Sequence, residues 1–247
     1  MTLQQLNAEL LICRRCPRLV EWRERVAREK RRAYRDWDYW GKPVPGFGDL
    51  HARVFVVGLA PGAHGSNRTG RQFTGDASGD FLYSALYRAG FASQPASISR
   101  DDGLTLTDLY TAPVCRCAPP DNKPTPQEMA NCQPYLEWEI EIIQPKVFVA
   151  LGRIAFEAIL RTRPLTEDRH PNSLVNGRLS SVVFSHGALY SLITDSLNTG
   201  HWLLASYHPS RQNTQTGRLT VEMFDQVWKT VQGLLNKTVS SGYWIGA

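Results

Sequence analysis

Residues 52–90, ARVFVVGLAPGAHGSNRTGRQFTGDASGDFLYSALYRAG, are the stretch from which the fold is predicted. The β-branched run at 52–58 predicts a buried strand, and the apolar spacing within 77–90 predicts a helix. The loop between them is rich in glycine and poor in large apolar side chains, so it is not a core element. In an open α/β sheet, backbone N–H groups and a helix N-terminus face the crevice beyond the strand's carboxyl end. We therefore expect the loop at 58–76 to hold a ligand.

The same alternation of strands and helices continues along the chain. Thr2 is a candidate cap for a helix ending near Ile12, and Pro17 begins a second, basic helix that DYWGKPVPGFGD at 38–49 ends. Parallel sheets covered by helices on both faces show this alternation. The further expected elements are strands at 106–114, 145–152 and 201–210, helices at 153–161 and 220–235, a polar loop at 163–177, a hairpin within 180–193, and a polar, glycine-containing loop after the last strand.

Composition limits the possible classes of protein. The 247 residues are 42% hydrophobic, which suits one domain with a sizeable core. The longest apolar runs, VFVAL and WLLAS, are too short to cross a bilayer, and the N-terminus lacks a signal-peptide core, so we expect a cytoplasmic protein. Lys and Arg number 28 against 23 Asp and Glu, and residues 14–35 hold ten basic and three acidic residues. That basic stretch is either a solvated helix face or a phosphate-binding surface.

The cysteines suggest a metal site. Five cysteines in a cytoplasmic chain do not indicate disulfides. Cys13 and Cys16 form C-x2-C, and Cys115, Cys117 and Cys132 lie further along. Two plus two of these give a four-thiolate site for zinc or an iron-sulfur cluster, and the wide second pair favours the cluster. The alternative is an accidental C-x2-C with buried apolar cysteines elsewhere.

Four blocks together resemble a known family. They are CRRC at 13–16, GLAPGAHGSNRTGRQFTGD at 58–76, CRCAPPDNKPTPQEMANC at 115–132 and SYHPSRQNTQTGRLT at 206–220. In this order they resemble the iron-sulfur branch of the uracil-DNA glycosylase superfamily, most closely its family 5 (type b) enzymes. The resemblance implies an α/β fold, a three-layer α/β/α sandwich around a short, mostly parallel central sheet. It also implies one domain over 1–247, with a helical segment at 1–45 that contributes two cysteines.

The resemblance further implies a cofactor, a partner and a reaction. The implied 4Fe-4S ligands are Cys13, Cys16, Cys117 and Cys132, which leaves Cys115 out. Such monofunctional glycosidases of base excision repair flip a deaminated base out of DNA, because its glycosidic bond cannot be reached inside the stack. Hydrolysis then leaves an abasic site. We expect a monomer that acts on DNA containing uracil or other deaminated bases, with no membrane partner.

Two residues are the candidate catalytic groups. His208, at the end of the last strand, is expected to hydrogen-bond the base O2 and stabilise the leaving anion; otherwise it caps a turn. Asp76 is the candidate for orienting water or stabilising the cationic sugar, and it can also cap the following helix. Other branches of the superfamily carry an acid or amide after the first glycine of this loop, whereas this chain has Leu59 and Ala60.

Other loop residues are candidates for recognising the base. Phe73 resembles the aromatic that stacks on the flipped base, with a core phenylalanine as the alternative. Asn122 can read the uracil edge through its amide. The usual reader, an Asn on the second strand, is missing from TAPV at 111–114, which predicts a roomier pocket that also accepts hypoxanthine and xanthine. The loop residues expected to line this pocket are Gly58, Ala60 and Gly62.

Polar residues beside these loops are candidates for binding DNA. Arg68, Arg71, Ser210 and Arg211 suit phosphates that flank a kinked lesion, with solvated charge as the alternative for each. The segment 211–218 is expected to enter the duplex. Two other classes of function stay open: an iron-sulfur electron-transfer protein, and a nucleic-acid binder that keeps the fold without the chemistry.

Overall fold

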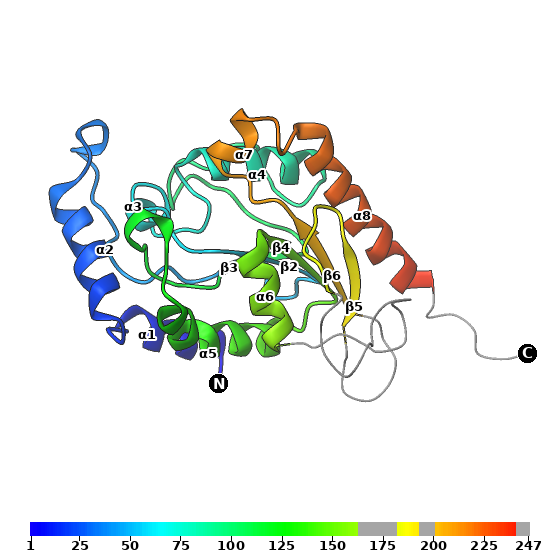
Figure 1. Ribbon diagram of the computed structural model, residues 1–247, viewed down its shortest axis with the longest axis horizontal. Coiled ribbons are helices and arrows are strands. Elements are labelled where there is room, and N and C mark those ends of the chain that lie inside the picture. The colour runs from blue at the N-terminus through cyan, green and yellow to red at the C-terminus, as the bar shows by residue number, and fades with distance from the viewer. Residues whose placement is uncertain (163–181, 193–200, 241–247) are drawn as a thin grey trace, which may run out of the picture.

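The computed structural model describes residues 1–162, 182–192 and 201–240, and its centre is a mostly parallel sheet (Figure 1). In the described residues the sheet has six strands in the order β1-β3-β2-β4-β6-β5. Neighbours among β2, β3, β4 and β6 pair in parallel, whereas β1 and β5 add antiparallel edges. The strands are β1 (Phe47–Gly48), β2 (Val54–Gly58), β3 (Leu109–Pro113), β4 (Val147–Leu151), β5 (Leu189–Leu192) and β6 (His201–Ser206).

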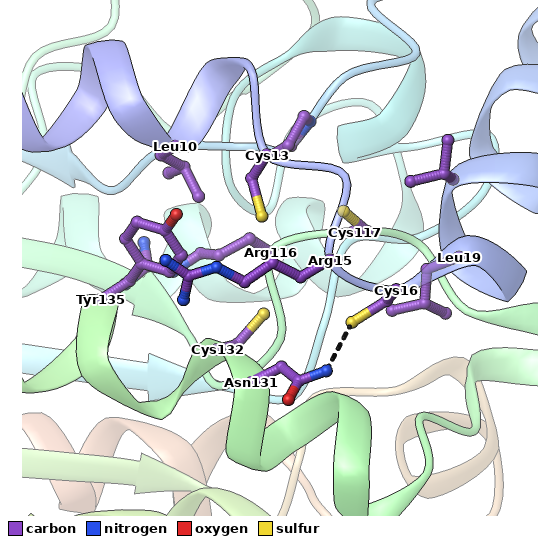
Figure 2. Close-up of a pocket in the computed structure, with 12 residues that line it drawn as sticks. Leu10, Cys13, Arg15, Cys16, Leu19, Arg116, Cys117, Asn131, Cys132 and Tyr135 are labelled. Carbon is purple, nitrogen blue, oxygen red and sulfur yellow. Dashed lines mark hydrogen bonds between the residues drawn. The ribbon is translucent and has the colours of Figure 1, made fainter.

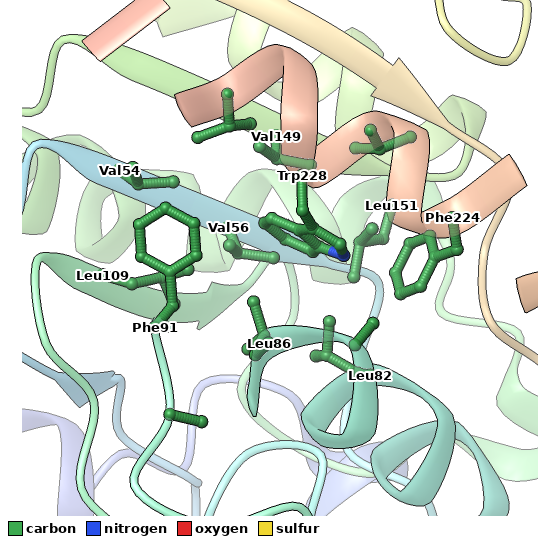
Figure 3. Close-up of a cluster of buried hydrophobic side chains, with 14 of the residues drawn as sticks. Val54, Val56, Leu82, Leu86, Phe91, Leu109, Val149, Leu151, Phe224 and Trp228 are labelled. Atoms are coloured by element: carbon green, nitrogen blue, oxygen red, sulfur yellow. The ribbon is translucent and has the colours of Figure 1, made fainter. Parts of the chain in front are cut away.

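Helices cover both faces of the sheet, as the resemblance implied. Successive side chains of a strand point to opposite faces, so β2 supplies Val54 and Val56 to one core and Phe55 and Val57 to the other. The first core is closed by α4 (Ala77–Arg88) and α8 (Val221–Ser240), with Trp228 packed between strand and helix side chains (Figure 3). The second is closed by α5 (Pro126–Ile143) and α6 (Arg153–Thr162). The predicted α/β/α sandwich is therefore confirmed.

Two helices at the N-terminus lie at the end of the sheet away from α8 (Figure 1). They are α1 (Leu3–Leu11) and α2 (Pro17–Glu29), followed by η1 (Arg32–Tyr34). The predicted cap is confirmed, since Thr2 and Gln5 form a capping box. Short helices α3 (Ser66–Thr69), η2 (Pro120–Asn122) and α7 (Arg211–Gln215) lie within the connecting loops. No helix in the described ranges has both the length and the hydropathy needed to span a bilayer.

The structure corrects three sequence predictions. The helix α5 was not predicted, although Thr125 and Glu128 form a capping box there and Pro126 occupies its first turn. The hairpin expected within 180–193 is wrong for the described part, because β5 pairs with β6 instead. The polar loop expected after β6 contains the helix α7. The predicted loop at 163–177 lies outside the described residues.

We predict that Leu82→Ala will lower the free energy of unfolding by about 2–5 kcal/mol, because it empties space in a core that cannot fully collapse. Leu82 is fully buried between α4 and the sheet. Tyr87→Ala on the same helix is the control, since Tyr87 is 49% exposed and its loss should cost less than about 0.5 kcal/mol. Urea unfolding followed by circular dichroism measures both, and equal effects would contradict the predicted packing.

Candidate active site and cysteine site

The carboxyl ends of the four parallel strands form one edge of the sheet, where the loop at 59–76 meets the segments that follow β3, β4 and β6. The Val114 N–H donates to the Gly58 carbonyl at 2.9 Å, and the Gly152 N–H donates to the Ser206 carbonyl at 2.8 Å. These bonds tie neighbouring strand ends together beyond the ladder. Ligands of open α/β sheets bind at such an edge.

Phe73 and His208 lie together at this edge. Their ring centroids are 6.2 Å apart with an interplanar angle of 36°. The Phe73 ring also lies against Gly58, where an added Cβ would come within 2.6 Å of the ring, so a side chain at position 58 would displace it. Phe73 has a left-handed φ of 51°, which is uncommon for a bulky residue and turns its side chain inward. It therefore packs against the core and also reaches the candidate base pocket.

Asp76 caps helix α4 and faces the glycine loop. Its Oδ1 accepts hydrogen bonds from the backbone N–H groups of Ser78 at 3.1 Å and Gly79 at 3.0 Å, so the predicted capping role is confirmed. Its Oδ2 lies close to two glycines of the loop. A Cβ added at Gly65 would lie 2.0 Å from this oxygen, and a Cβ added at Gly62 would lie 2.9 Å from it. Burial raises the pKa of Asp76, and the two helix N–H bonds oppose that rise.

His208 is an uncharged imidazole held through its backbone. Burial lowers the pKa of His208 to about 4, so the ring is neutral at pH 7. Its carbonyl accepts a hydrogen bond from Asn213 Nδ2 at 2.8 Å. The Asn213 N–H in turn donates to Ser210 Oγ at 3.3 Å, which makes Ser210 the cap of α7. Sequence reasoning missed Asn213, although its position three residues after a capping serine was available as an indication.

A second histidine fixes the residue before His208. The Tyr207 N–H donates to His186 Nδ1 at 3.2 Å, and the two rings stack with centroids 5.2 Å apart. Because Nδ1 accepts, Nε2 carries the proton and donates to the Met223 carbonyl at 3.3 Å. His186 thus links the end of β6 to α8. Sequence reasoning missed this residue, and no local pattern indicates it.

The remaining predicted residues are placed differently from the Phe73–His208 pair. Asn122 is exposed at the end of η2, and Ala60 packs against the buried cysteines. Arg71 is 4% exposed and ties the loop to Asp102 at 2.7 Å, and Arg68 is 3% exposed and bonds carbonyls of the loop itself, so both side chains are buried in this structure. We carry the predicted DNA contact forward for Arg211, which is exposed, and Ser210 beside it.

Four cysteines line one pocket between the N-terminal turn, the loop after β3 and helix α5. Figure 2 shows the sulfurs of Cys13, Cys16, Cys117 and Cys132 turned toward the same space. They are the four residues that the resemblance implied as ligands. Cys115 is fully buried outside this lining.

N–H donors surround the sulfurs of this pocket. Arg23 Nη1 donates to Cys117 Sγ at 2.9 Å, and Asn131 Nδ2 donates to Cys16 Sγ at 3.3 Å. Burial raises the pKa of the Cys117 thiol to about 12, and the charge and hydrogen bond of Arg23 oppose that rise. Within the described ranges, no three His, Cys, Asp or Glu side chains come close enough to share a single metal ion.

Comparison with known proteins identifies relatives over most of the chain. Residues 45–232 match the family model described as the uracil DNA glycosylase superfamily. A type-5 uracil-DNA glycosylase of Thermus thermophilus is 54% identical over 219 residues, which cover 88% of this chain and 91% of the relative. One of Mycobacterium leprae is 47% identical over 236 residues, covering 94% and 96%. One of Pyrobaculum aerophilum is 45% identical over 218 residues, covering 88% and 87%.

Proposed function

Because the chain belongs to the uracil-DNA glycosylase superfamily, we propose that it removes uracil from DNA by hydrolysing the N-glycosidic bond, leaving an abasic site. The relatives at 45–54% identity carry the name of this activity. The observation that carries the proposal is the position of the Phe73–His208 pair, beside the loop that ends at Asp76. An aromatic face, a neutral imidazole and a buried carboxylate at one sheet edge suit an extruded base.

The roles of the three side chains follow from their surroundings. Phe73 stacks on the flipped base. His208 donates an N–H to the base O2, where negative charge develops as the bond breaks, and its neutral state lets it do so without a desolvated cation. Asp76, as a carboxylate, stabilises the cationic sugar or orients the attacking water. Leu59 and Ala60 transfer no proton, so the carboxylate of Asp76 is the acidic group of this loop.

We predict that Asp76→Asn and His208→Asn will each lower the single-turnover rate roughly a hundredfold or more, because each removes a group that stabilises the transition state. Asn also caps helices well, so the first variant should keep α4 intact. Alkali-labile strand breaks in uracil-containing DNA measure the rate. Asp101→Asn and His51→Asn, at exposed positions, are the matched controls.

Two results would exclude catalysis by this site. A wild-type protein that binds uracil-containing DNA without cleaving it is a nucleic-acid binder. Rates of both site variants within about threefold of wild type, with activity present, would remove Asp76 and His208 from the mechanism.

We also propose that the cysteine pocket holds a 4Fe-4S cluster. Four cysteines that face one space, with N–H donors to the sulfurs of Cys117 and Cys16, suit such a cluster, and the wide sequence spacing of Cys117 and Cys132 favours it over a zinc ion. When bound, the cluster crosslinks the N-terminal helices to the loop after β3 and to α5. Its role is architectural: it holds Asn122 in register with the basic helix α2.

Purified protein should be brown, absorb at about 400 nm and contain iron. Cys13→Ser, Cys16→Ser, Cys117→Ser and Cys132→Ser should each lower iron content and this absorption strongly, because each removes a ligand. Cys115→Ser is the matched control and should retain both, since Cys115 does not line the pocket. Stoichiometric zinc without colour would contradict the cluster, and loss of iron in Cys115→Ser alone would contradict the ligand set.

We further propose that the enzyme accepts other deaminated bases, such as hypoxanthine and xanthine. Strand β3 reads LYTAP and offers no amide at its carboxyl end to read uracil strictly. Sites that exclude analogues by a buried hydrogen bond discriminate by about 10⁴–10⁵-fold, and this strand lacks such a group.

The uracil-to-hypoxanthine rate ratio should therefore lie below about 10⁴. Single-turnover rates on otherwise identical duplexes, each with one damaged base, measure this ratio. An undamaged duplex is the control for non-specific cleavage. A ratio above that value would show that another group enforces uracil specificity.

A further inference from the structure

Arg68 is a buried cation that has no ion-pair partner among the described residues. The residue is 3% exposed, and no carboxylate of the described ranges forms a salt bridge with it. Arg71, three residues later, is equally buried but is neutralised by Asp102 through two hydrogen bonds of 2.8 and 2.7 Å. A buried charge is costly unless it is paired and hydrogen-bonded. The surroundings of Arg68 must therefore compensate its charge in another way.

Aromatic faces and carbonyls surround the Arg68 guanidinium. Its Cζ lies 4.0 Å from the ring centroids of both Tyr34 and Trp37, so the group is within cation–π distance of two rings. Nε donates to the His64 carbonyl at 2.7 Å, and Nη2 donates to the Gly75 carbonyl at 2.9 Å. Nη1 has no hydrogen-bond partner in the part of the chain that the structure describes. The charge is thus held in place without being neutralised.

The contact with Gly75 reaches the residue before Asp76. A Cβ added at Gly75 would lie 2.3 Å from Arg68 Nη2, and Gly75 has a φ of 76°, so the guanidinium and this peptide fit closely. The bonded carbonyl belongs to the peptide whose nitrogen is that of Asp76. A shift of Arg68 would therefore move the start of α4 and the carboxylate that caps it.

The charge of Arg68 also acts on Asp76. Burial raises the pKa of Asp76, the Gly79 and Ser78 N–H bonds oppose that rise, and the charge of Arg68 adds a smaller effect in the same lowering direction. The other titratable groups that face Asp76 are Asp80 and Tyr83 of α4, and neither supplies positive charge. The Ser78 and Gly79 N–H groups add partial positive charge from the helix N-terminus.

We propose that Arg68 is a positioning residue, whose guanidinium, held by Tyr34 and Trp37, fixes the Gly75–Asp76 peptide and places its positive charge near the Asp76 carboxylate. The proposal rests on the proposed function, in which Asp76 acts as a carboxylate. It takes the place of the DNA phosphate contact that the sequence predicted for this arginine. It also assigns Tyr34 and Trp37, which follow the cysteine-bearing turn and α2, a role in the catalytic loop.

The test compares the pH–rate profiles of wild type, Arg68→Met, Arg68→Lys and Trp37→Leu. Without the cation the pKa of Asp76 rises, so Arg68→Met should move the acid limb of the profile to higher pH. Its loss of rate should then be largest below that limb and should shrink as the pH rises and Asp76 ionises. Arg68→Lys keeps the positive charge but loses the guanidinium N–H groups that bond the His64 and Gly75 carbonyls. It should therefore lower the rate while the acid limb stays close to its wild-type pH. Trp37→Leu admits water that screens the charge, so it should shift the limb in the same direction as Arg68→Met.

Direct titration of Asp76 separates this proposal from the proposed function. The carboxyl ¹³C resonance of Asp76, assigned by its absence in Asp76→Asn, should titrate at higher pH in Arg68→Met even if Asp76 proves dispensable for cleavage. Arg53→Met is the control: it removes the Arg53–Asp108 pair and should leave the titration of Asp76 unchanged. If Arg68→Met does not fold, the titration of the Asp76 carboxyl resonance in Trp37→Leu tests the same proposal.

Three results would overturn the proposal. The first is an unchanged Asp76 titration in the folded variants. The second is a loss of rate that is uniform across pH in Arg68→Met. The third is a weaker salt dependence of DNA binding in Arg68→Met, with the slope of log K against log salt concentration reduced by about one. That result would assign Arg68 to a phosphate contact instead.

Discussion

The buried ion pair between Arg116 and Glu139 determines how the loop that carries Cys117 faces the helix that carries Cys132. The two side chains are each 1% exposed, and Glu139 also accepts a hydrogen bond from Tyr110 Oη at 3.2 Å. Arg116 stands between two cysteines in the loop after β3, and Glu139 belongs to α5, the helix that carries Cys132. A partner lost from such a pair leaves an uncompensated charge that costs about 3–5 kcal/mol. The pair therefore holds the loop and α5 in one relative position.

The cysteine site and the base pocket are connected through short contacts. Arg23 donates to the sulfur of Cys117, and its own carbonyl accepts a hydrogen bond from Asn67 Nδ2 at 3.2 Å. Asn67 is fully buried in α3, inside the loop that ends at Asp76. Ala60, from the same loop, packs against the cysteines directly. The sulfurs and the loop at 58–76 are therefore joined by packed, hydrogen-bonded groups.

The sequence predicts the parts of this structure that local patterns control. Buried strands such as Val147–Leu151 and the cap at Thr2 follow from β-branched runs and capping chemistry. The helix at Pro126–Ile143 was missed because its interior Pro134 and its mixed apolar and acidic residues conceal the helical period. The burial of Arg68 was not predictable, because its partners Tyr34 and Trp37 are distant in sequence and only the fold brings them near.

Burial has opposite effects on the two candidate catalytic groups, and the fold compensates only one of them. Desolvation favours the neutral form of both side chains. The neutral form suits the hydrogen bond proposed for His208, and no carboxylate of the described residues acts on the pKa of this ring. The role proposed for Asp76 needs the charged form. The fold accordingly supplies two helix N–H groups and the positive charge of Arg68 near this carboxylate. Desolvation at this sheet edge thus keeps the imidazole neutral, while two N–H groups of α4 and the Arg68 guanidinium of α3 oppose the rise that burial causes in the pKa of Asp76.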